Sequence, residues 1–405
     1  MADTKLELLA PAGDRERLLM ALRYGADAVY LAGRKFGMRS SAVSFSDEGL
    51  REAVRLAHES LARVYVTCNT LPREEELLVL PEYLEFLQDA AVDGLIVADL
   101  GVMALAKRYA PRTALHVSTQ LGVINSETAK VLYDMGADTV VLARETPLED
   151  ILRIRANAPP QLRLEAFVHG AMCVSFSGRC LLSNYLTGRD ANRGQCAQPC
   201  RWKYHLVEET RPGQYFEISE DGGTHIMNSH DMRMIEHLPE LIDAGITSFK
   251  IEGRMKSAYY TAVVTNAYRH ALDAAMAGEE LDPVWVEETE KVSQRPYSTG
   301  FYFGEPGQYY ADATYFSETD VAAVVESCDA DGMACLTQRN KFSRGDELEL
   351  LTPTGKPIRF TARELFDEDA APLGDTRRAM MPFSMRLPIC APPLSIVRKY
   401  RRQEG

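Results

Sequence analysis

The chain has 405 residues, a net charge of −13 and an ordinary globular composition, with 46% hydrophobic and 25% charged residues. These values exclude a disordered, collagen-like or coiled-coil chain, and the length predicts one large domain with a smaller one. No uncharged apolar run is long enough to cross a bilayer, and no basic segment precedes an apolar one at the start, so we expect a cytoplasmic protein without a signal peptide. The acidic balance argues against nucleic-acid binding through the whole surface and leaves a local basic patch as the alternative.

Strand-like apolar runs alternate with helix-like stretches through the first 250 residues. The first run is followed by an N-cap at Asp14, apolar residues at helical spacing and a glycine C-cap at Gly25. The pattern predicts eight strands, at 6–10, 27–32, 63–68, 94–98, 114–118, 138–143, 162–168 and 247–252. Eight strand–helix units predict an α/β fold, a (β/α)8 TIM-like barrel. An open doubly wound sheet is the alternative, but no glycine-rich dinucleotide fingerprint follows the first strand.

A long insertion, about 170–245, separates the seventh strand from the eighth, and such insertions usually serve function at the carboxyl-terminal face of the barrel. A helix is predicted over 257–278, followed by a linker at 296–307. From about 319, short strands with turns predict a small antiparallel β-barrel, which is either a docking or lid module or a stabilising appendage. The predicted domains are therefore a barrel domain at 1–305 and a β-barrel domain at 306–405.

Four cysteines fall within 28 residues of the insertion, Cys173, Cys180, Cys196 and Cys200, at C-x6-C-x15-C-x3-C spacing. Thiolates suit iron–sulfur clusters and zinc. The last pair has zinc-like spacing, but the first gap is loose for zinc, whereas a cluster is larger and tolerates wider spacing. We expect an iron–sulfur cluster here, with zinc and unligated thiols as the alternatives. The other cysteines are scattered in strand-like contexts and are expected in the core: Cys68, Cys328, Cys335 and Cys390.

Polar residues gather where the predicted strands end. Strand alternation places Glu165, Phe167 and His169 on one face, and Lys250 and Glu252 share a face of the eighth strand. Others lie at or just past strand ends: Asn69, His116, Ser118, Gln120, Arg144, Glu145, Arg254 and Lys256. Polar groups facing a barrel axis are costly to bury unless they bind something, and chemistry in such barrels occurs at this end. We expect an ionisable cup there, with mutual ion pairing without a ligand as the alternative.

Basic residues cluster around the four cysteines. From 163 to 203, six cations (Arg163, Arg179, Arg189, Arg193, Arg201 and Lys203) face two carboxylates, Glu165 and Asp190. This island can meet the phosphates of RNA or the carboxylates of a small substrate, or it can offset the charge of a thiolate-bound cluster. The segment 398–402 is a second basic region, expected to be a solvated terminus.

Several phrases together resemble one known family. The longer ones are EAFVHGAMC at 165–173, SGRC at 177–180, GRDANRGQC at 188–196, CRW at 200–202, NSHDM at 228–232 and KIEGRMKS at 250–257. Shorter matches are LLAPAG at 8–13, STQ at 118–120, LARE at 142–145 and QRNKF at 338–342. Over nearly its whole length the chain is similar to the collagenase-like peptidase family of unknown catalytic type.

The members most similar in length and layout are tRNA hydroxylation proteins. The resemblance implies a 4Fe-4S enzyme that installs a hydroxyl on carbon 5 of the wobble uridine, with prephenate as a required metabolite. It implies that Cys173, Cys180, Cys196 and Cys200 match the cluster cysteines. Relatives differ in the fourth ligand, which leaves Cys200 open.

The resemblance also suggests roles for the predicted cup. The barrel mouth would hold prephenate or a uridine unstacked from the tRNA anticodon loop, with Arg144, Arg254 and Lys256 pairing with carboxylates or phosphates. The other expected substrate-binding residues are Asn69, His116, Gln120, Glu145, Arg189 and Arg193. The expected proton-transfer residues are Glu165, His169 and Glu252.

Two other functions stay open. A peptidase is one: Cys173 and His169 are a conceivable nucleophile pair, whereas the zinc-protease phrase begun by His58 and Glu59 lacks its second histidine, because Ala62 stands there. No Gly-x-Ser-x-Gly elbow occurs. The other is a non-catalytic, cluster-bearing subunit that works with a paralogue, and a homo-oligomer is a further possible assembly.

Overall fold

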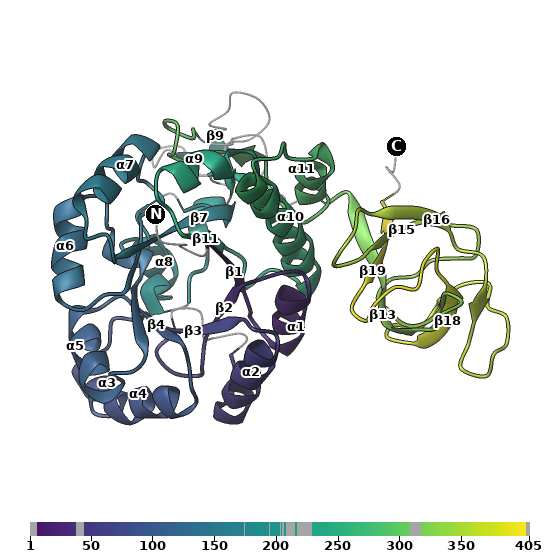
Figure 1. The fold of residues 1–405 in the computed structure, drawn as a ribbon, viewed down its shortest axis with the longest axis horizontal. Helices are drawn as coiled ribbons and strands as arrows, with labels where there is room; N and C mark the ends of the chain where they lie inside the picture. The colour runs from purple at the N-terminus through teal and green to yellow at the C-terminus, as the bar shows by residue number, and fades with distance from the viewer. Residues whose placement is uncertain are drawn as a thin grey trace.

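The computed structural model describes residues 6–37, 44–173, 175–193, 195–202, 204, 206–207, 215–216, 229–307 and 317–401. Eight parallel strands form a closed barrel: β1 (Glu7–Pro11), β2 (Ala28–Leu31), β3 (Arg63–Cys68), β4 (Gly94–Val97), β5 (Ala114–Val117), β6 (Thr139–Val141), β7 (Arg163–Ala171) and β11 (Ser248–Ile251). The barrel closes because β11 pairs with both β1 and β7. The predicted (β/α)8 architecture is confirmed, and Figure 1 shows the helices surrounding the strands.

The ring of helices comprises α1 (Arg15–Arg23), α2 (Asp47–Glu59), α3 (Glu74–Leu77), α4 (Leu80–Asp89), α5 (Leu100–Tyr109), α6 (Ser126–Asp134), α7 (Leu148–Asn157), α9 (Leu238–Asp243) and α10 (Ala258–Ala277). Several begin at a side chain that accepts a hydrogen bond from the first turn: Asp14, Ser46, Asp99, Asn125 and Ser257. Such caps satisfy amides that have no partner inside the helix. The local sequence therefore sets where these helices start.

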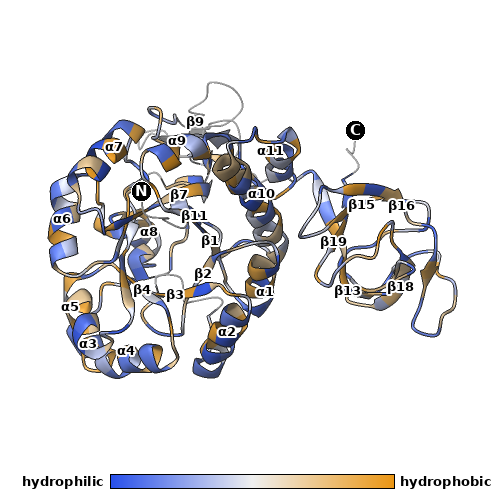
Figure 2. Cartoon of the chain, viewed as in Figure 1, coloured by the Kyte–Doolittle hydropathy of each residue, from blue (hydrophilic) through white to orange (hydrophobic). Residues whose placement is uncertain are grey.

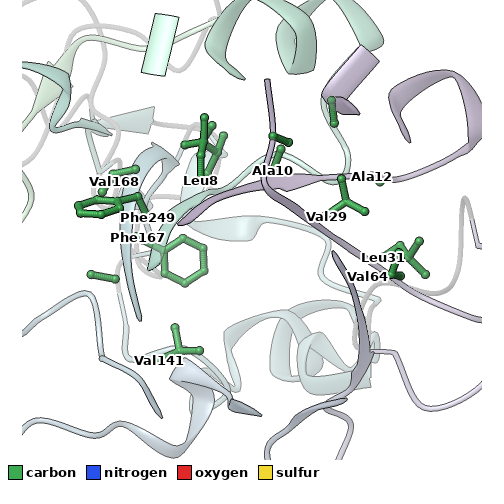
Figure 3. Close-up of a cluster of buried hydrophobic side chains, with 14 of the residues drawn as sticks. Leu8, Ala10, Ala12, Val29, Leu31, Val64, Val141, Phe167, Val168 and Phe249 are labelled. Carbon is green, nitrogen blue, oxygen red and sulfur yellow. The ribbon is translucent and has the colours of Figure 1, made fainter. Parts of the chain in front are cut away.

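The core lies between the barrel wall and the helices. Residues on the outer side of the strands, such as Leu8, Val29 and Val64, are fully buried there (Figure 3). The helices that cover them alternate between hydrophobic and hydrophilic residues, as Figure 2 shows for α2 and α6. Strand residues between these outer positions point inward, and several of them are polar. The apolar wall thus leaves the barrel interior free to carry polar groups. In the part of the chain described, no helix combines the length and the hydropathy needed to cross a membrane.

The insertion after β7 contains α8 (Leu182–Thr187), short 3-10 turns at Ala191–Arg193 and Pro199–Arg201, and the pair β8 (Leu206–Val207) and β9 (Tyr215–Phe216). The end of β7 projects past the barrel and pairs antiparallel with β10 (Asp231–Arg233). Strand β10 in turn pairs with β12 (Tyr297–Ser298). The prediction of a linker at 296–307 is therefore wrong for the first half of that segment. Strand β12 extends the barrel sheet, and the Tyr302 hydroxyl donates to the carbonyl of Phe167 at 2.7 Å.

The C-terminal region is a separate curled antiparallel sheet, at the right of Figure 1. Its strands are β13 (Thr319–Cys328), β14 (Met333–Gln338), β15 (Glu347–Leu351), β16 (Ile358–Thr361), β17 (Leu365–Phe366), β18 (Pro382–Arg386) and β19 (Ile396–Tyr400), in the order β16-β15-β19-β13-β14-β18-β17. The sheet curls around its own core, in which Phe342 packs edge-on against Phe383. The predicted all-β module is confirmed.

Buried charges hold this sheet against α10 and α11 (Pro283–Glu290). Arg398 is fully buried and pairs with Glu288 at 2.6 Å and, through its Nε, with Glu349 at 2.8 Å. Lys291 pairs with Glu288 at 2.8 Å, and the Tyr24 hydroxyl donates to the carbonyl of Leu394 at 3.0 Å. The expected solvated terminus at 398–402 is therefore wrong for Arg398, because β19 is an interior strand whose arginine meets carboxylates of both parts.

Candidate functional site

The floor of the barrel interior is built on Glu7. This carboxylate is fully buried and accepts from the Tyr65 hydroxyl at 2.7 Å, the Ser248 hydroxyl at 2.9 Å and Arg163 at 3.2 Å. Arg63 also pairs with it. Sequence reasoning overlooked Glu7, although a charged residue within an apolar strand was a usable signal. The saturated carboxylate closes the amino-terminal end of the interior.

The next layer upward is an ion pair between Glu165 and Lys250. Their charged atoms lie 2.7 Å apart and both side chains are almost completely buried. Burial alone would raise the pKa of Glu165, but Lys250 and His116 outweigh it and lower this pKa to about 2. His116 Nδ1 stands 3.7 Å from the carboxylate, too far for a hydrogen bond. Lys250 also lies over the Tyr30 ring, 4.7 Å from its centroid. Glu165 is therefore a fixed anion at neutral pH.

At the mouth, Arg144 links three neighbours. Its Nη2 lies 3.0 Å from a Glu252 carboxylate oxygen, its Nη1 donates to the carbonyl of Ala171 at 2.8 Å, and its guanidinium sits 4.0 Å from the centroid of the Phe167 ring. Figure 3 labels Phe167 of β7 and Phe249 of β11, whose rings point to opposite sides of the barrel wall. A guanidinium that packs on one aromatic ring and donates from both Nη atoms keeps a fixed direction, which favours oriented binding of an anion.

Amide groups line another part of the mouth. Asn69 Nδ2 donates to Gln120 Oε1 at 2.7 Å, and Ser118 donates to the same oxygen at 3.2 Å. Arg254 donates to the Thr67 hydroxyl at 3.0 Å. All five side chains are buried, and they come from the carboxyl ends of β3, β5 and β11. The structure thus brings together predicted residues from distant parts of the sequence.

Lys256 and Glu145 occupy the edge of this group. Lys256 donates to the carbonyl of Ser293 at 2.9 Å. Burial lowers the pKa of Lys256 to about 8. The positive charges of Arg201 and Arg295 also lower this pKa, whereas the carboxylates of Asp231 and Glu252 raise it. Glu145 is half-buried, and burial raises its pKa. Each has an ionisation perturbed mainly by burial, a feature that is common at functional sites.

His169 lies elsewhere. Lys250 and Ile251 are consecutive in β11, but they pair with Phe167 and His169 of β7, so Val168 is an extra residue in β7. Such a bulge redirects the side chains that follow. His169 is buried among tyrosines: its ring nitrogens lie 3.3 Å from the hydroxyls of Tyr268 and Tyr297. Burial lowers its pKa to about 3. The structure does not bring His169 together with Glu165, so we assign it a positioning role rather than proton transfer.

The cysteine-bearing insertion is fastened across the mouth. Arg193 donates to the carbonyl of Leu71 at 3.2 Å, past the end of β3. Arg179 reaches the carbonyl of Leu121 at 3.4 Å, and the backbone of Gly178 lies against Gln120, past the end of β5. Arg189 is exposed on the insertion. The insertion therefore covers the end of the barrel where Gln120 and Asn69 lie.

Three thiols of the insertion lie within electrostatic reach of the fourth, Cys200. Burial raises the pKa of Cys200, and the thiols of Cys173, Cys196 and Cys180 raise it further. The amide of Gln198 donates to Cys196 Sγ at 3.4 Å, a contact suited to a thiolate. Within the described residues, no three His, Cys, Asp or Glu side chains converge on one metal-ion position. Cysteine thiolates are ligands of both iron–sulfur clusters and zinc, so these four residues could hold either group.

The remaining cysteines differ from expectation. Only Cys68 is buried, whereas Cys328 is partly exposed and Cys335 and Cys390 are exposed on the C-terminal sheet. The expectation that all four belong to the core is wrong for these three: Cys328 and Cys335 lie on strands whose alternate residues face solvent, and Cys390 lies in the connection between β18 and β19.

A buried pair behind the site also escaped sequence reasoning. Arg295 is fully buried and pairs with Asp231, with Nη2 at 2.6 Å and Nε at 3.0 Å from the same oxygen. Asp231 belongs to the quoted phrase at 228–232, whose first residue lies outside the described residues, as does Lys203 of the basic island. The pair anchors β10 to the start of β12 and so supports the edge of the mouth beside Lys256.

Comparison with known proteins relates most of the chain to one protein family. The pattern of peptidase family U32 matches residues 13–312, and the pattern of the peptidase family U32 C-terminal domain matches 317–398. The tRNA hydroxylation protein P1 of Bacillus subtilis (strain 168) is 38% identical over 402 residues, 98% of this chain and 95% of that protein. A collagenase of Porphyromonas gingivalis is 33% identical over 312 residues, 74% of each chain. Among solved structures, the U32 peptidase Mk0906 shares 17% identity over 62% of this chain and 95% of that one, with a TM-score of 0.42.

Proposed function

This chain belongs to peptidase family U32, and from that premise we propose that it is an RNA-modifying enzyme. The proposed reaction is hydroxylation of carbon 5 of the wobble uridine of tRNA, with prephenate as co-substrate and a 4Fe-4S cluster on Cys173, Cys180, Cys196 and Cys200. The observation that carries the proposal is the position of the thiol-bearing insertion, whose arginines bind the loops that follow β3 and β5 at the mouth of a polar barrel. The full-length similarity to a tRNA hydroxylation protein supports it.

Two buried polar atoms of the cup that have no hydrogen-bond partner in the described part of the chain favour the binding of a ligand there. Among the described residues, the buried Nδ1 of His116 and Nε of Arg144 have no hydrogen-bond partner. Leaving such atoms without a partner costs free energy, which a bound molecule can recover. Arg144 and Arg254 suit the carboxylates of prephenate, and the side-chain amides of Gln120 and Asn69 suit the edge of a uracil base.

Each residue has a distinct part in the proposed mechanism. Arg144 and Arg254 orient the anionic groups, and Glu252, paired with Arg144, holds or releases a proton at its carboxylate near the mouth. Glu165, whose pKa is lowered, and its ion-pair partner Lys250 set the electrostatic field of the interior. A cluster held by Cys173, Cys180, Cys196 and Cys200 would supply redox chemistry, and a cluster held by the first three alone would also offer an iron without a protein ligand as a Lewis acid.

The insertion also suits the approach of a single-stranded loop. It exposes Tyr185 (85%), Trp202 (42%) and Phe176 (37%), with Arg189 beside them in the sequence. Exposed aromatic rings stack on unpaired bases, and arginines contact their phosphates. Taking a base out of an anticodon loop costs little because that base is not paired.

A peptidase stays the second candidate, favoured by the similarity to a protein named collagenase. Its most direct nucleophile pair is weakened, because His169 bonds Tyr268 and Tyr297 rather than Cys173. A subunit that acts only with a paralogue is the third candidate, and the assay below separates all three.

The test begins with anaerobic purification, a visible spectrum, and iron and sulfide determinations. We expect a brown protein with iron and sulfide, both lost in Cys180→Ala and retained in Cys335→Ala, a matched control because Cys335 is also a surface thiol, on the C-terminal sheet. The same variants are then expressed in a strain lacking the gene, and tRNA nucleosides are measured. 5-Hydroxyuridine in the Cys180→Ala strain would sink the proposal. Peptide cleavage by the iron-free protein would favour the peptidase, and modification only after co-expression of a paralogue would favour the subunit.

A further inference from the structure

A basic surface lies on the C-terminal sheet, outside the site described above. Apart from the buried Arg398, the two loops at 339–344 and 375–380 and strand β19 carry six cations: Arg339, Lys341, Arg344, Arg377, Arg378 and Lys399. The same stretches, with the turn that follows the first loop, carry two carboxylates, Asp346 and Asp375. In a chain of net charge −13, this concentration is a clear segregation of charge.

The two loops form one surface. Ser343 and Asp375 are bridged as neighbouring backbone positions, and the amide of Arg344 donates to the carbonyl of Gly374 at 2.8 Å. Lys399 donates to the carbonyl of Lys341. Asp375 is shared between Arg377 at 2.5 Å and Lys341 at 3.4 Å, so one carboxylate faces two cations. The side chains of Arg377 and Lys341 are 79% and 63% exposed, which leaves their charges accessible to a ligand.

The basic surface is on the mouth side of the molecule. Arg339 pairs with Glu16 at 2.7 Å, and Glu16 lies in the first turn of α1. Because α1 follows the carboxyl end of β1, this turn belongs to the end of the barrel that carries the mouth. The next residue, Arg17, donates to the carbonyl of Lys256, a residue of the cup. The buried pairs of Arg398 with Glu288 and Glu349 keep the C-terminal sheet in this orientation.

Exposed cations on paired loops suit a ligand with regularly spaced negative charges, which describes a nucleic-acid backbone. We infer that the basic surface binds backbone phosphates of the same RNA whose loop nucleotide enters the barrel mouth, at a distance from that nucleotide along the RNA. This inference rests on the proposed function and assigns the C-terminal sheet the task of positioning the RNA. Phosphate contacts fix register and orientation without reading sequence, so the basic surface would contribute affinity to many tRNAs equally.

The experiment compares two charge reversals that change the net charge equally. Arg377→Glu removes a cation of the basic surface. Arg386→Glu removes an arginine that is likewise paired with one carboxylate, Glu364, but stands at the opposite end of the β14–β18 pair, where Met333 faces Arg386 and Thr337 faces Pro382. Binding of a fluorescent, unmodified tRNA transcript is followed by anisotropy at several salt concentrations.

We expect Arg377→Glu to raise the Kd about tenfold and to lower the slope of log K against log salt by about one, as for one lost phosphate contact. We expect Arg386→Glu to stay within about twofold of the wild type. Lys341→Ala provides a milder second variant on the same surface, and circular dichroism checks that each variant is folded.

Equal affinity of the Arg377→Glu variant and the wild type would overturn the inference, as would equal losses in both reversals. Loss of binding to an acidic polyglutamate peptide without loss of tRNA binding would overturn it in favour of an acidic protein partner. The proposed function is judged separately, by 5-hydroxyuridine in the Cys180→Ala strain. Normal tRNA affinity in Arg377→Glu combined with loss of 5-hydroxyuridine in Cys180→Ala would therefore refute only the basic surface.

Discussion

The buried ion pair of the barrel interior makes a quantitative prediction about stability. Glu165 has no exposed side-chain surface, and its pKa falls from 4.5 to about 2 in the folded chain because burial, which opposes ionisation, is outweighed by Lys250 and His116. Each pKa unit corresponds to about 1.4 kcal/mol, so ionised Glu165 stabilises the native state by about 3 kcal/mol at neutral pH. Glu165→Gln removes this term and leaves the Lys250 ammonium buried without a carboxylate, which costs about 3–5 kcal/mol.

The free energy of unfolding is measured in urea for Glu165→Gln, Lys250→Met and the double variant. We expect the double variant to be more stable than Glu165→Gln, because it removes both charges together. Glu149→Gln is the matched control, since Glu149 pairs with Arg153 on the surface of α7 with 74% of its side chain exposed. That control should change stability by less than about 0.5 kcal/mol.

The pH dependence of the free energy of unfolding tests this reasoning. The contribution of Glu165 is complete above its unfolded pKa of 4.5 and is lost as the pH falls toward about 2. The stability difference between wild type and Glu165→Gln should therefore shrink over that window. A change below about 1 kcal/mol at pH 7, together with parallel pH profiles, would refute the reasoning that Lys250 determines the charge of Glu165.

Two further predictions concern other buried groups. The pKa of His169 falls from 6.5 to about 3 on folding, mainly through burial, so between these two pH values the unfolded chain binds more protons than the folded chain and the folded state loses stability as the pH is lowered. Between pH 6.5 and 5, urea unfolding should show a loss of about 2 kcal/mol that the His169→Gln variant lacks. Equal pH profiles of the two proteins would contradict this prediction. Arg398→Met leaves Glu288 and Glu349 buried without their arginine, so it should destabilise the chain by about 3–5 kcal/mol and speed proteolysis between the barrel and the C-terminal sheet. The control Arg401→Ala removes an exposed ion pair and should change stability by less than about 1 kcal/mol. Unchanged resistance of Arg398→Met to proteolysis would contradict the role of this buried network in docking the sheet.

Local sequence patterns were sufficient for the eight strands of the barrel and the helices around them, but not for β12 or β19. Apolar runs of strand length, capping residues such as Asp14 and Ser257, and glycines such as Gly25 at helix ends determine where strands and helices begin and end. The count of eight such units was enough to predict the barrel, because parallel strands with covering helices have few ways to close. The same patterns separated the all-β C-terminal sheet from the barrel.

What the sequence could not supply was the direction of individual side chains. A bulge at Val168 turns His169 toward the tyrosines of α10 and β12, although strict alternation would keep it beside Glu165. Arg398 lies in a charged tail segment of the sequence and yet is fully buried. A backbone irregularity of one residue or a partner more than a hundred positions away leaves no trace in local periodicity.

The sequence by itself therefore determined the order and type of the barrel elements and the grouping of four cysteines in the insertion that follows the seventh strand, because these depend on neighbours along the chain. Only the tertiary structure decided which polar residues share the interior. It paired Glu165 with Lys250 and Arg144 with Glu252, and it joined Arg339 to Glu16 on the mouth side. These contacts depend on barrel closure and on the docking of the C-terminal sheet, which bring distant residues within a few ångströms of one another.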